Sequence, residues 1–158
     1  MTDQQDFATV AKGLSALDHL GVAELELLYK LERTAGRLYE LLADAVGNDE
    51  AAALLRRNGR EELGHAARTK RALARKLGHD WTPTAELEEL YPLALPPAVG
   101  PDLLEAIIVG EQAGDADYQR WADHEPDPEI AELLRRNGAE ETGHGERATR
   151  AAAILRAG

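Results

Sequence analysis

The chain contains a long internal repeat. A shift of 79 positions aligns residues 21–74 with residues 100–153 without a gap, and 23 of the 54 aligned positions are identical. A repeat of this length is typical of two copies of one supersecondary unit and not of a solenoid built from short units. The chain is therefore expected to fold as two similar halves that a pseudo-twofold axis can relate.

The composition indicates that each half is a helical hairpin. The 158 residues are rich in Ala, Leu, Glu and Arg, which favour helices, and only 4% are aromatic. The hairpins are expected at residues 22–78 and 100–157, with a crossover at residues 79–99 that contains four prolines. We predict one all-α domain over residues 1–158, an antiparallel four-helix bundle made of two repeated hairpins joined by a long crossover.

Capping residues predict where the helices begin and end. The first helix should stop at Gly47, with Asn48 as the N-cap of the second, and Gly100-Pro101 should open the third. Asp127 should cap the fourth helix. Residues 1–20 form an N-terminal extension outside the repeat, for which the sequence suggests only a short helix over Leu14, Leu17 and Leu20.

Each half carries a Glu-x-x-His motif preceded by a lone glutamate. Because residues three apart lie side by side on a helix, each motif sets a carboxylate next to an imidazole. Counting from the turn of each hairpin, the lone glutamate lies 16 residues before it and the motif about as far after it. At about 1.5 Å per residue, every one of these side chains lies roughly 24 Å from its own turn. The six residues are Glu32, Glu62, His65, Glu111, Glu141 and His144.

The alternative is that these glutamates are ordinary surface residues of charged helices. Against it, all four lie on the apolar stripe of their helices, and none has Lys or Arg three or four positions away. The neighbouring Glu61 and Glu140 do have an arginine four positions before them, so we expect these two to be solvated ion-pair residues of little consequence. Four bare carboxylates in a core are costly unless cations lie among them. The pattern therefore predicts two divalent metal ions.

The type of ligand favours iron or manganese over zinc and does not distinguish between the two. By symmetry, Glu32 and His65 are expected on one ion, and Glu111 and His144 on the other. Glu62 and Glu141 would then bridge the pair. Tyr39 and Tyr118, seven residues after the lone glutamates, are candidate catalytic residues that could hydrogen-bond a ligating carboxylate across the bundle or give up an electron. Asn58 and Asn137, one turn before the bridging glutamates, could orient a ligand.

With these residues the chain resembles the rubrerythrin branch of the ferritin-like superfamily over about residues 21–157. The resemblance implies a di-iron centre that reacts with hydrogen peroxide or dioxygen, a homodimer, and a role in oxidative stress defence. The chain departs from the family pattern in having no Cys, and therefore no rubredoxin domain, and in having Gly114 where an additional glutamate is usual. Its only Met is Met1, which excludes a haem held by methionine pairs. Manganese catalases share the bundle, so a manganese or mixed centre stays an alternative.

The expected function is that of a di-metal oxidoreductase that reacts with peroxide or dioxygen and receives electrons from an external redox protein. The alternatives are a ferroxidase that handles iron and a metal-free helical interaction module. The net charge of −11 argues against nucleic acid and anionic membranes as partners. The sequence shows no apolar run long enough to span a membrane, and its polar, acidic start is unlike a signal peptide, so a cytoplasmic protein is expected.

Overall fold

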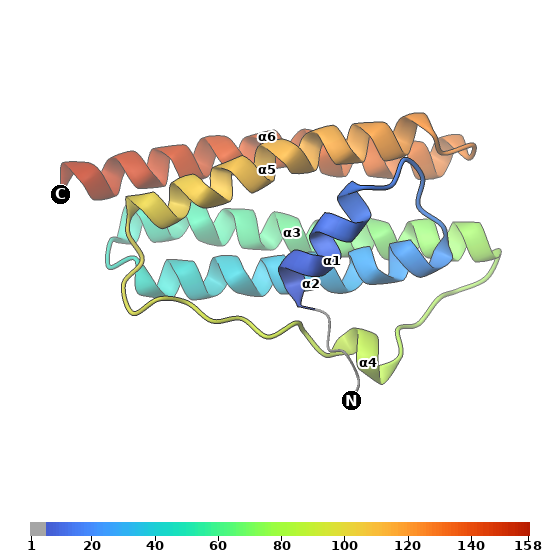
Figure 1. Cartoon of the computed structure of the whole chain (residues 1–158), viewed down its shortest axis with the longest axis horizontal. Helices are drawn as coiled ribbons and strands as arrows, with labels where there is room; N and C mark the ends of the chain where they lie inside the picture. Colours follow the sequence, from blue (N-terminus) through green and yellow to red (C-terminus); the bar gives the residue numbers. More distant parts are fainter. Residues whose placement is uncertain (1–5) are drawn as a thin grey trace.

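Two long helical hairpins make up most of the molecule (Figure 1). The computed structural model describes residues 6–158. The first hairpin consists of α2 (Val22–Ala45) and α3 (Asp49–Leu77), and the second of α5 (Pro101–Asp123) and α6 (Pro128–Ala157). Two shorter helices, α1 (Phe7–Ser15) and α4 (Ala85–Glu88), complete the described part of the chain, which contains no strand. The predicted all-α, ferritin-like bundle of two hairpins is confirmed.

The helix ends follow the local sequence. Gly47 adopts a φ of +66° in the turn between α2 and α3, a conformation that glycine tolerates best. The Asn48 side chain then accepts a hydrogen bond from the Ala51 amide at 3.0 Å, and Asp127 caps α6 in the same way. α5 begins at Pro101, whose missing amide hydrogen costs nothing in the first turn.

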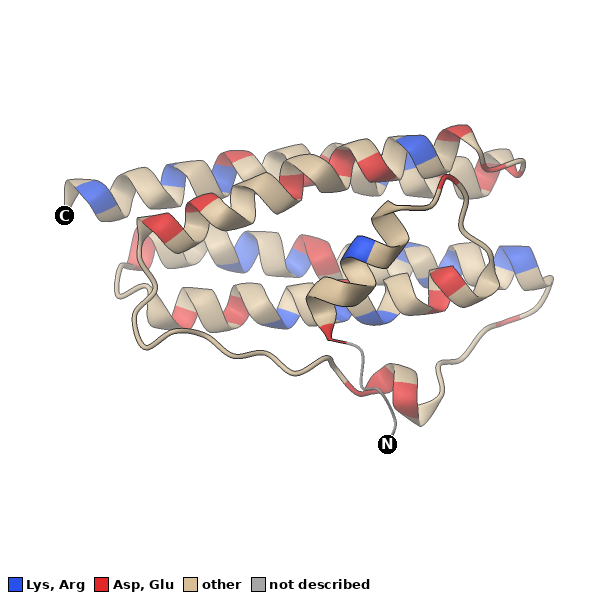
Figure 2. Cartoon of the chain, viewed as in Figure 1, with Lys and Arg blue, Asp and Glu red and all other residues tan. Residues whose placement is uncertain are grey.

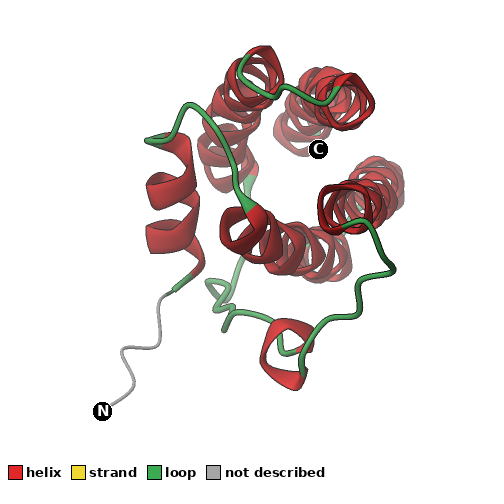
Figure 3. Ribbon diagram, turned by 90° about the vertical axis from the view of Figure 1, so that its right-hand side faces the viewer, coloured by secondary structure: helices red, strands yellow, loops and turns green. Residues whose placement is uncertain are grey.

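The hairpins meet mainly where α3 packs against α6, whereas α2 and α5 do not pack closely on each other. The view along the bundle shows the four long helices at its corners, with α1 beside the edge formed by α2 and α5 (Figure 3). Buried apolar residues form two clusters, one containing Leu28 and Leu134 and the other containing Leu42 and Leu55. The polar residues of the candidate site lie between these two clusters.

Glycines allow the helices of each hairpin to approach closely. A Cβ atom added at Gly59 would lie 3.1 Å from the Gly36 carbonyl oxygen, and one at Gly138 would lie 2.9 Å from the Cβ of Tyr118. These contacts offset the roughly 1 kcal/mol that glycine costs in a helix interior. Gly64 has no such neighbour, since only the flexible end of Arg68 comes within 4 Å.

The crossover runs along α2 and packs on it through α4. The Trp81 indole nitrogen donates to Glu26 at 2.9 Å, and the Tyr91 amide donates to the Thr34 hydroxyl at 3.2 Å. The N-terminal helix is shorter than expected: α1 ends at Ser15, so Leu17 and Leu20 lie outside it, and Leu17 is exposed. Residues 1–5 of the predicted extension lie outside the described residues.

Charge is distributed unevenly over the four long helices (Figure 2). α5 carries six acidic residues and a single basic one, Arg120, whereas α3 carries eight basic residues and four acidic ones. Among the described residues, no helix is both long and apolar enough to cross a membrane.

Candidate metal centre

All six predicted ligand residues lie in one buried layer of the bundle. α2 supplies Glu32, α3 supplies Glu62 and His65, α5 supplies Glu111, and α6 supplies Glu141 and His144. Both imidazoles are fully buried, and the four glutamates are between 2% and 9% exposed. The equal spacing of these residues from the two turns therefore predicts their common level in the bundle correctly.

The side chains form two overlapping groups that could each hold a metal ion. Glu32 and His65 belong to one, Glu111 and His144 to the other, and Glu62 and Glu141 to both. Within each group the ligand atoms lie within 4.8 Å of one another, and within residues 6–158 no other group of this kind occurs. This is the composition that the symmetric assignment requires, with two shared glutamates between two separate Glu–His pairs. The binding of metal by these residues stays a prediction.

The imidazoles point their Nδ1 atoms into the carboxylate cluster. His65 Nδ1 lies 3.2 Å from Glu62 Oε2, and His144 Nδ1 lies 3.3 Å from Glu62 Oε1. Each Nδ1 is also 3.4 Å from an oxygen of Glu141. The two rings stack with their centroids 5.2 Å apart, so the two halves of the site are in direct contact.

Unpaired polar atoms show that the residues fit a metal pair. Over the described residues, the buried side-chain atoms without a hydrogen-bond partner all belong to Glu62, His65 and His144, and both Nδ1 atoms are among them. A buried polar atom without a partner costs about 1–3 kcal/mol. A cation among the carboxylates would accept a lone pair from Glu62 Oε2 and from the Nδ1 atom of each neutral imidazole, which are the oxygen and nitrogen ligands that suit iron or manganese.

Burial and mutual repulsion raise the pKa of two of the four carboxyl groups in the metal-free protein. Burial, reinforced by the charge of Glu62, raises the pKa of Glu32 to about 8. Burial also raises the pKa of Glu111 to about 7, with a further contribution from Glu141. For Glu62 and Glu141, the attraction of the nearby imidazoles, and for Glu141 also the interaction with Glu111, outweighs burial, and the pKa of both carboxyl groups is lowered.

The pKa of both imidazoles is also raised, by the carboxylates around them. Burial disfavours the imidazolium form, but the surrounding carboxylates outweigh it, so the pKa of His65 is raised and that of His144 is raised to about 12. Without a metal, protons on the imidazoles therefore offset part of the carboxylate charge. Metal ligation needs the neutral imidazole and the ionised carboxylate, so binding must release these protons.

The two tyrosines hydrogen-bond the lone glutamates of the opposite hairpin. The Tyr39 hydroxyl donates to Glu111, and the Tyr118 hydroxyl donates to Glu32. Burial next to these carboxylates raises the pKa of both phenols well above the usual value, so both stay protonated donors. The predicted hydrogen bond across the bundle is confirmed, and the catalytic role of Tyr39 and Tyr118 stays a prediction.

The expectation for Glu61 and Glu140 is confirmed in one part, because the arginine four positions before each lies within ion-pair distance of it. The expected solvation of the two carboxylates is wrong. Both are only partly exposed, and each approaches the Nε2 atom of the histidine on the opposite helix. Glu140 Oε2 lies 3.0 Å from His65 Nε2 with hydrogen-bond geometry, and Glu61 Oε2 lies 3.2 Å from His144 Nε2. A carboxylate in this place fixes the ring orientation and tautomer of a histidine ligand and makes it more basic.

Two arginines, which the sequence reasoning missed, hold these carboxylates. Arg68 donates to Glu140 at 2.7 and 3.0 Å and to Asn137 at 2.7 Å. Arg147 makes the equivalent contacts to Glu61 and to Asn58. The repeat contained the signal, because these arginines occupy equivalent positions in the two halves. The sequence reasoning did not use this signal, because the arginine four residues before each glutamate suggested a surface ion pair within the same helix.

The asparagines support the histidines through the backbone. Asn58 donates to the carbonyl oxygen of His144 at 3.0 Å, and Asn137 donates to that of His65 at 3.4 Å. Asn137 also lies 3.3 Å from the Tyr118 hydroxyl. Each asparagine thus hydrogen-bonds the main chain of a predicted ligand in the other hairpin, and its role in orienting that ligand stays a prediction.

The fold and this site define a helical bundle of the ferritin-like class with a buried cluster of carboxylates and histidines. A family model described as rubrerythrin matches residues 23–152, which is most of the chain. The chain therefore belongs to the rubrerythrin family, a ferritin-like di-iron family. Comparison with curated proteins and with solved structures gives no match.

Proposed function

We propose that the protein is a di-iron oxidoreductase that reduces hydrogen peroxide or dioxygen with electrons from an external donor protein. The observation that carries the proposal is the pair of overlapping ligand groups with two shared glutamates. Such an arrangement holds two metal ions close together, so one small oxidant can meet both. Family membership supports iron as the metal.

The residues that would hold the metal pair are Glu32, Glu62, His65, Glu111, Glu141 and His144. Two ferrous ions bound there would supply the two electrons that cleave the O–O bond of peroxide, which takes up two protons to give two waters. Oxygen-rich ligands with imidazole suit iron, and manganese or a mixed pair is the alternative on the same ligands. The donor must then return two electrons per turnover.

The chain's own residues orient the ligands and shield them along the bundle axis. Glu61 and Glu140 contact the Nε2 atoms of the two imidazoles, on the side away from the carboxylate cluster. The tyrosine hydroxyls donate hydrogen bonds to one oxygen each of Glu32 and Glu111. The two apolar clusters on either side of the layer limit access of water along the bundle axis. A low local dielectric strengthens the interaction of the metal charge with the reacting oxygen atoms.

Stopped-flow mixing of the diferrous protein with peroxide, and separately with dioxygen, tests the proposal. We expect one peroxide to oxidise two ferrous ions, and a reductant to restore the ferrous state for further turnovers. Absence of oxidation by both oxidants would contradict it. A ferroxidase would instead continue to oxidise added ferrous iron far beyond two ions per chain and would accumulate it. Size-exclusion chromatography in the same preparation tests the expected homodimer against a large storage shell.

A further inference from the structure

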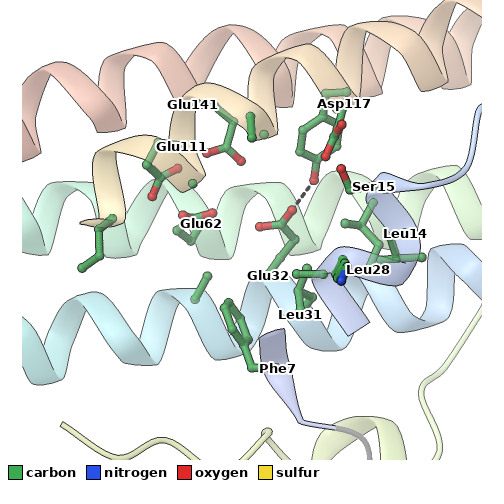
Figure 4. Close-up of a pocket in the computed structure, with 18 of the residues that line it drawn as sticks. Phe7, Leu14, Ser15, Leu28, Leu31, Glu32, Glu62, Glu111, Asp117 and Glu141 are labelled. Atoms are coloured by element: carbon green, nitrogen blue, oxygen red, sulfur yellow. Dashed lines mark hydrogen bonds between the residues drawn. The ribbon is translucent and has the colours of Figure 1, made fainter. Parts of the chain in front are cut away.

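A cavity of about 360 Å³ lies between α1, α2 and α5 and reaches the candidate metal centre. Figure 4 shows Glu32, Glu62, Glu111 and Glu141 at its inner end and Phe7, Leu14 and Leu31 on the side of α1 and α2. The cavity forms where α2 and α5 do not pack closely, and α1 provides part of its wall. This assigns a structural role to part of the N-terminal extension.

The cavity is much larger than the oxidant needs. Peroxide and dioxygen have two heavy atoms, and a water molecule with one heavy atom takes up about 30 Å³ in the liquid. A volume of 360 Å³ corresponds to about twelve waters and falls within the size range of small-molecule sites, about 300–1,000 Å³. Apolar cavities of about 150 Å³ already accept benzene.

Most of the wall is apolar, and the polar groups are concentrated at the inner end. Apolar contact comes from α1, α2 and α5, through Phe7, Leu28, Leu31, Leu38, Ile107 and Trp121. Glu62 at the inner end has a buried oxygen, Oε2, without a hydrogen-bond partner. An apolar pocket with a few convergent polar groups is the usual form of a small-molecule site.

The charges around the cavity select against anions. Five carboxylates line it, the four glutamates of the centre and Asp117, together with one basic residue, Lys12. At the inner end the described part of the wall offers carboxylates and phenols but no basic side chain, so an anionic ligand would lose its hydration there without a cationic partner in the wall, which is unfavourable. The occupant that fits is neutral and predominantly apolar.

Small residues on α2 and α5 keep the space open. Ala35 and Gly114 lie three positions after Glu32 and Glu111 and line the cavity, together with Gly110 and Ala113. Gly110 is exposed, and a Cβ atom added there would meet no atom within 4 Å, so the wall of the cavity is open at this position.

We propose that this cavity binds a small, neutral, predominantly apolar organic molecule with one end facing the four glutamates. This molecule would be bound beside the metal centre in addition to the oxidant. The inference therefore extends the proposed function, and the role of the molecule depends on that function. Its binding needs only the cavity, so binding and reaction can be tested separately.

Titration of the full chain with toluene, followed by calorimetry and by NMR, tests the proposal. We expect one saturable site per chain, with contacts from toluene to Leu31 and Ile107. Ala35→Leu adds three carbon atoms to the wall and should weaken binding at least about tenfold. Ala116→Leu is the matched control, since Ala116 is an exposed residue of α5 outside the cavity, and should bind as the parent does. Benzoate should bind the metal-free protein at least about tenfold more weakly than toluene.

Absence of a saturable toluene site, or equal binding by Ala35→Leu and the parent, would overturn the proposal. Metal content and peroxide consumption are measured on the same samples. Toluene binding in a chain that holds no metal would leave this inference standing and contradict the proposed function. Two metal ions and peroxide turnover without toluene binding would do the reverse.

Discussion

The hairpin α2–α3 and the hairpin α5–α6 supply equivalent ligands, yet the first is covered by other parts of the chain and the second is more open. α1 and α4 pack on α2, whereas Val109 on α5 is 68% exposed. Glu32 and Glu111 are nevertheless both buried, and burial raises the pKa of each, to about 8 and about 7. The repeat thus determines which ligands are present, while the segments outside the repeat determine how much of each hairpin is covered.

Replacing a shared glutamate should have the largest effect, and the effect should be the same in both hairpins. Glu62→Gln and Glu141→Gln each remove charge from both ligand groups, so we expect neither variant to hold the metal pair. Metal analysis of the purified variants measures this loss. Glu132→Gln, at an exposed position of α6, is the control and should hold two ions per chain. A shared-glutamate variant that kept both metals and full activity would show that the assignment of Glu62 and Glu141 is wrong.

Replacing the glutamate that faces the Nε2 atom of each histidine should have the next largest effect on metal binding, and the effect should differ between the two halves of the site. Glu140→Ala and Glu61→Ala are each expected to lower metal affinity by about 10- to 100-fold. Glu140→Ala should cost more, because His65 is hydrogen-bonded to Glu140 whereas His144 and Glu61 lie 3.2 Å apart without that geometry. Competition with a chelator of known affinity measures the loss. Glu146→Gln, an exposed neighbour on α6, should change nothing. Unchanged affinity in Glu140→Ala would refute the supporting role.

Metal affinity should rise with pH. In the metal-free protein the pKa values of Glu32, Glu111 and both histidines are raised, so these groups carry protons that binding must displace. Each proton released per ion strengthens binding by about tenfold per pH unit below the pKa concerned. Manganese titrations between pH 6 and 9 in buffers of different ionisation enthalpy measure the metal affinity and the number of protons released. An affinity independent of pH would contradict the shifted pKa values.

The helix glycines should give the smallest effects, of opposite sign. Gly138→Ala places a methyl group 2.9 Å from the Cβ of Tyr118 and should destabilise the fold by about 1–3 kcal/mol. Gly59→Ala meets its first neighbour at 3.1 Å and should cost less. Gly64→Ala meets only a flexible arginine and should stabilise by about 0.5–1 kcal/mol. Denaturant unfolding of the metal-free protein gives these values, and a destabilised Gly64→Ala would contradict the absence of a close helix contact at Gly64.

Features that depend on spacing within a hairpin could be predicted from the sequence. Capping by Asn48 and Asp127 is local, and the common level of the six ligands follows from equal distances to the two turns. The hydrogen bonds of Tyr39 and Tyr118 follow from their place two turns after the lone glutamates together with the pseudo-twofold relation.

Features that depend on how the hairpins pack could not be predicted. Whether Glu61 faces water or the opposite histidine depends on how α3 lies against α6. Arg57 can form its ion pair with Glu61 in either arrangement, so that pair does not distinguish them. The cavity depends on the separation of α2 and α5 and on the position of α1. No residue spacing within one helix contains that information.

Anomalous diffraction from crystals of the protein loaded with ferrous iron under anaerobic conditions tests the central claim most directly. The account predicts two anomalous peaks per chain, one beside Glu32 and His65 and one beside Glu111 and His144, with Glu62 and Glu141 contacting both. An absence of peaks in this layer, or a single peak elsewhere in the bundle, would contradict it.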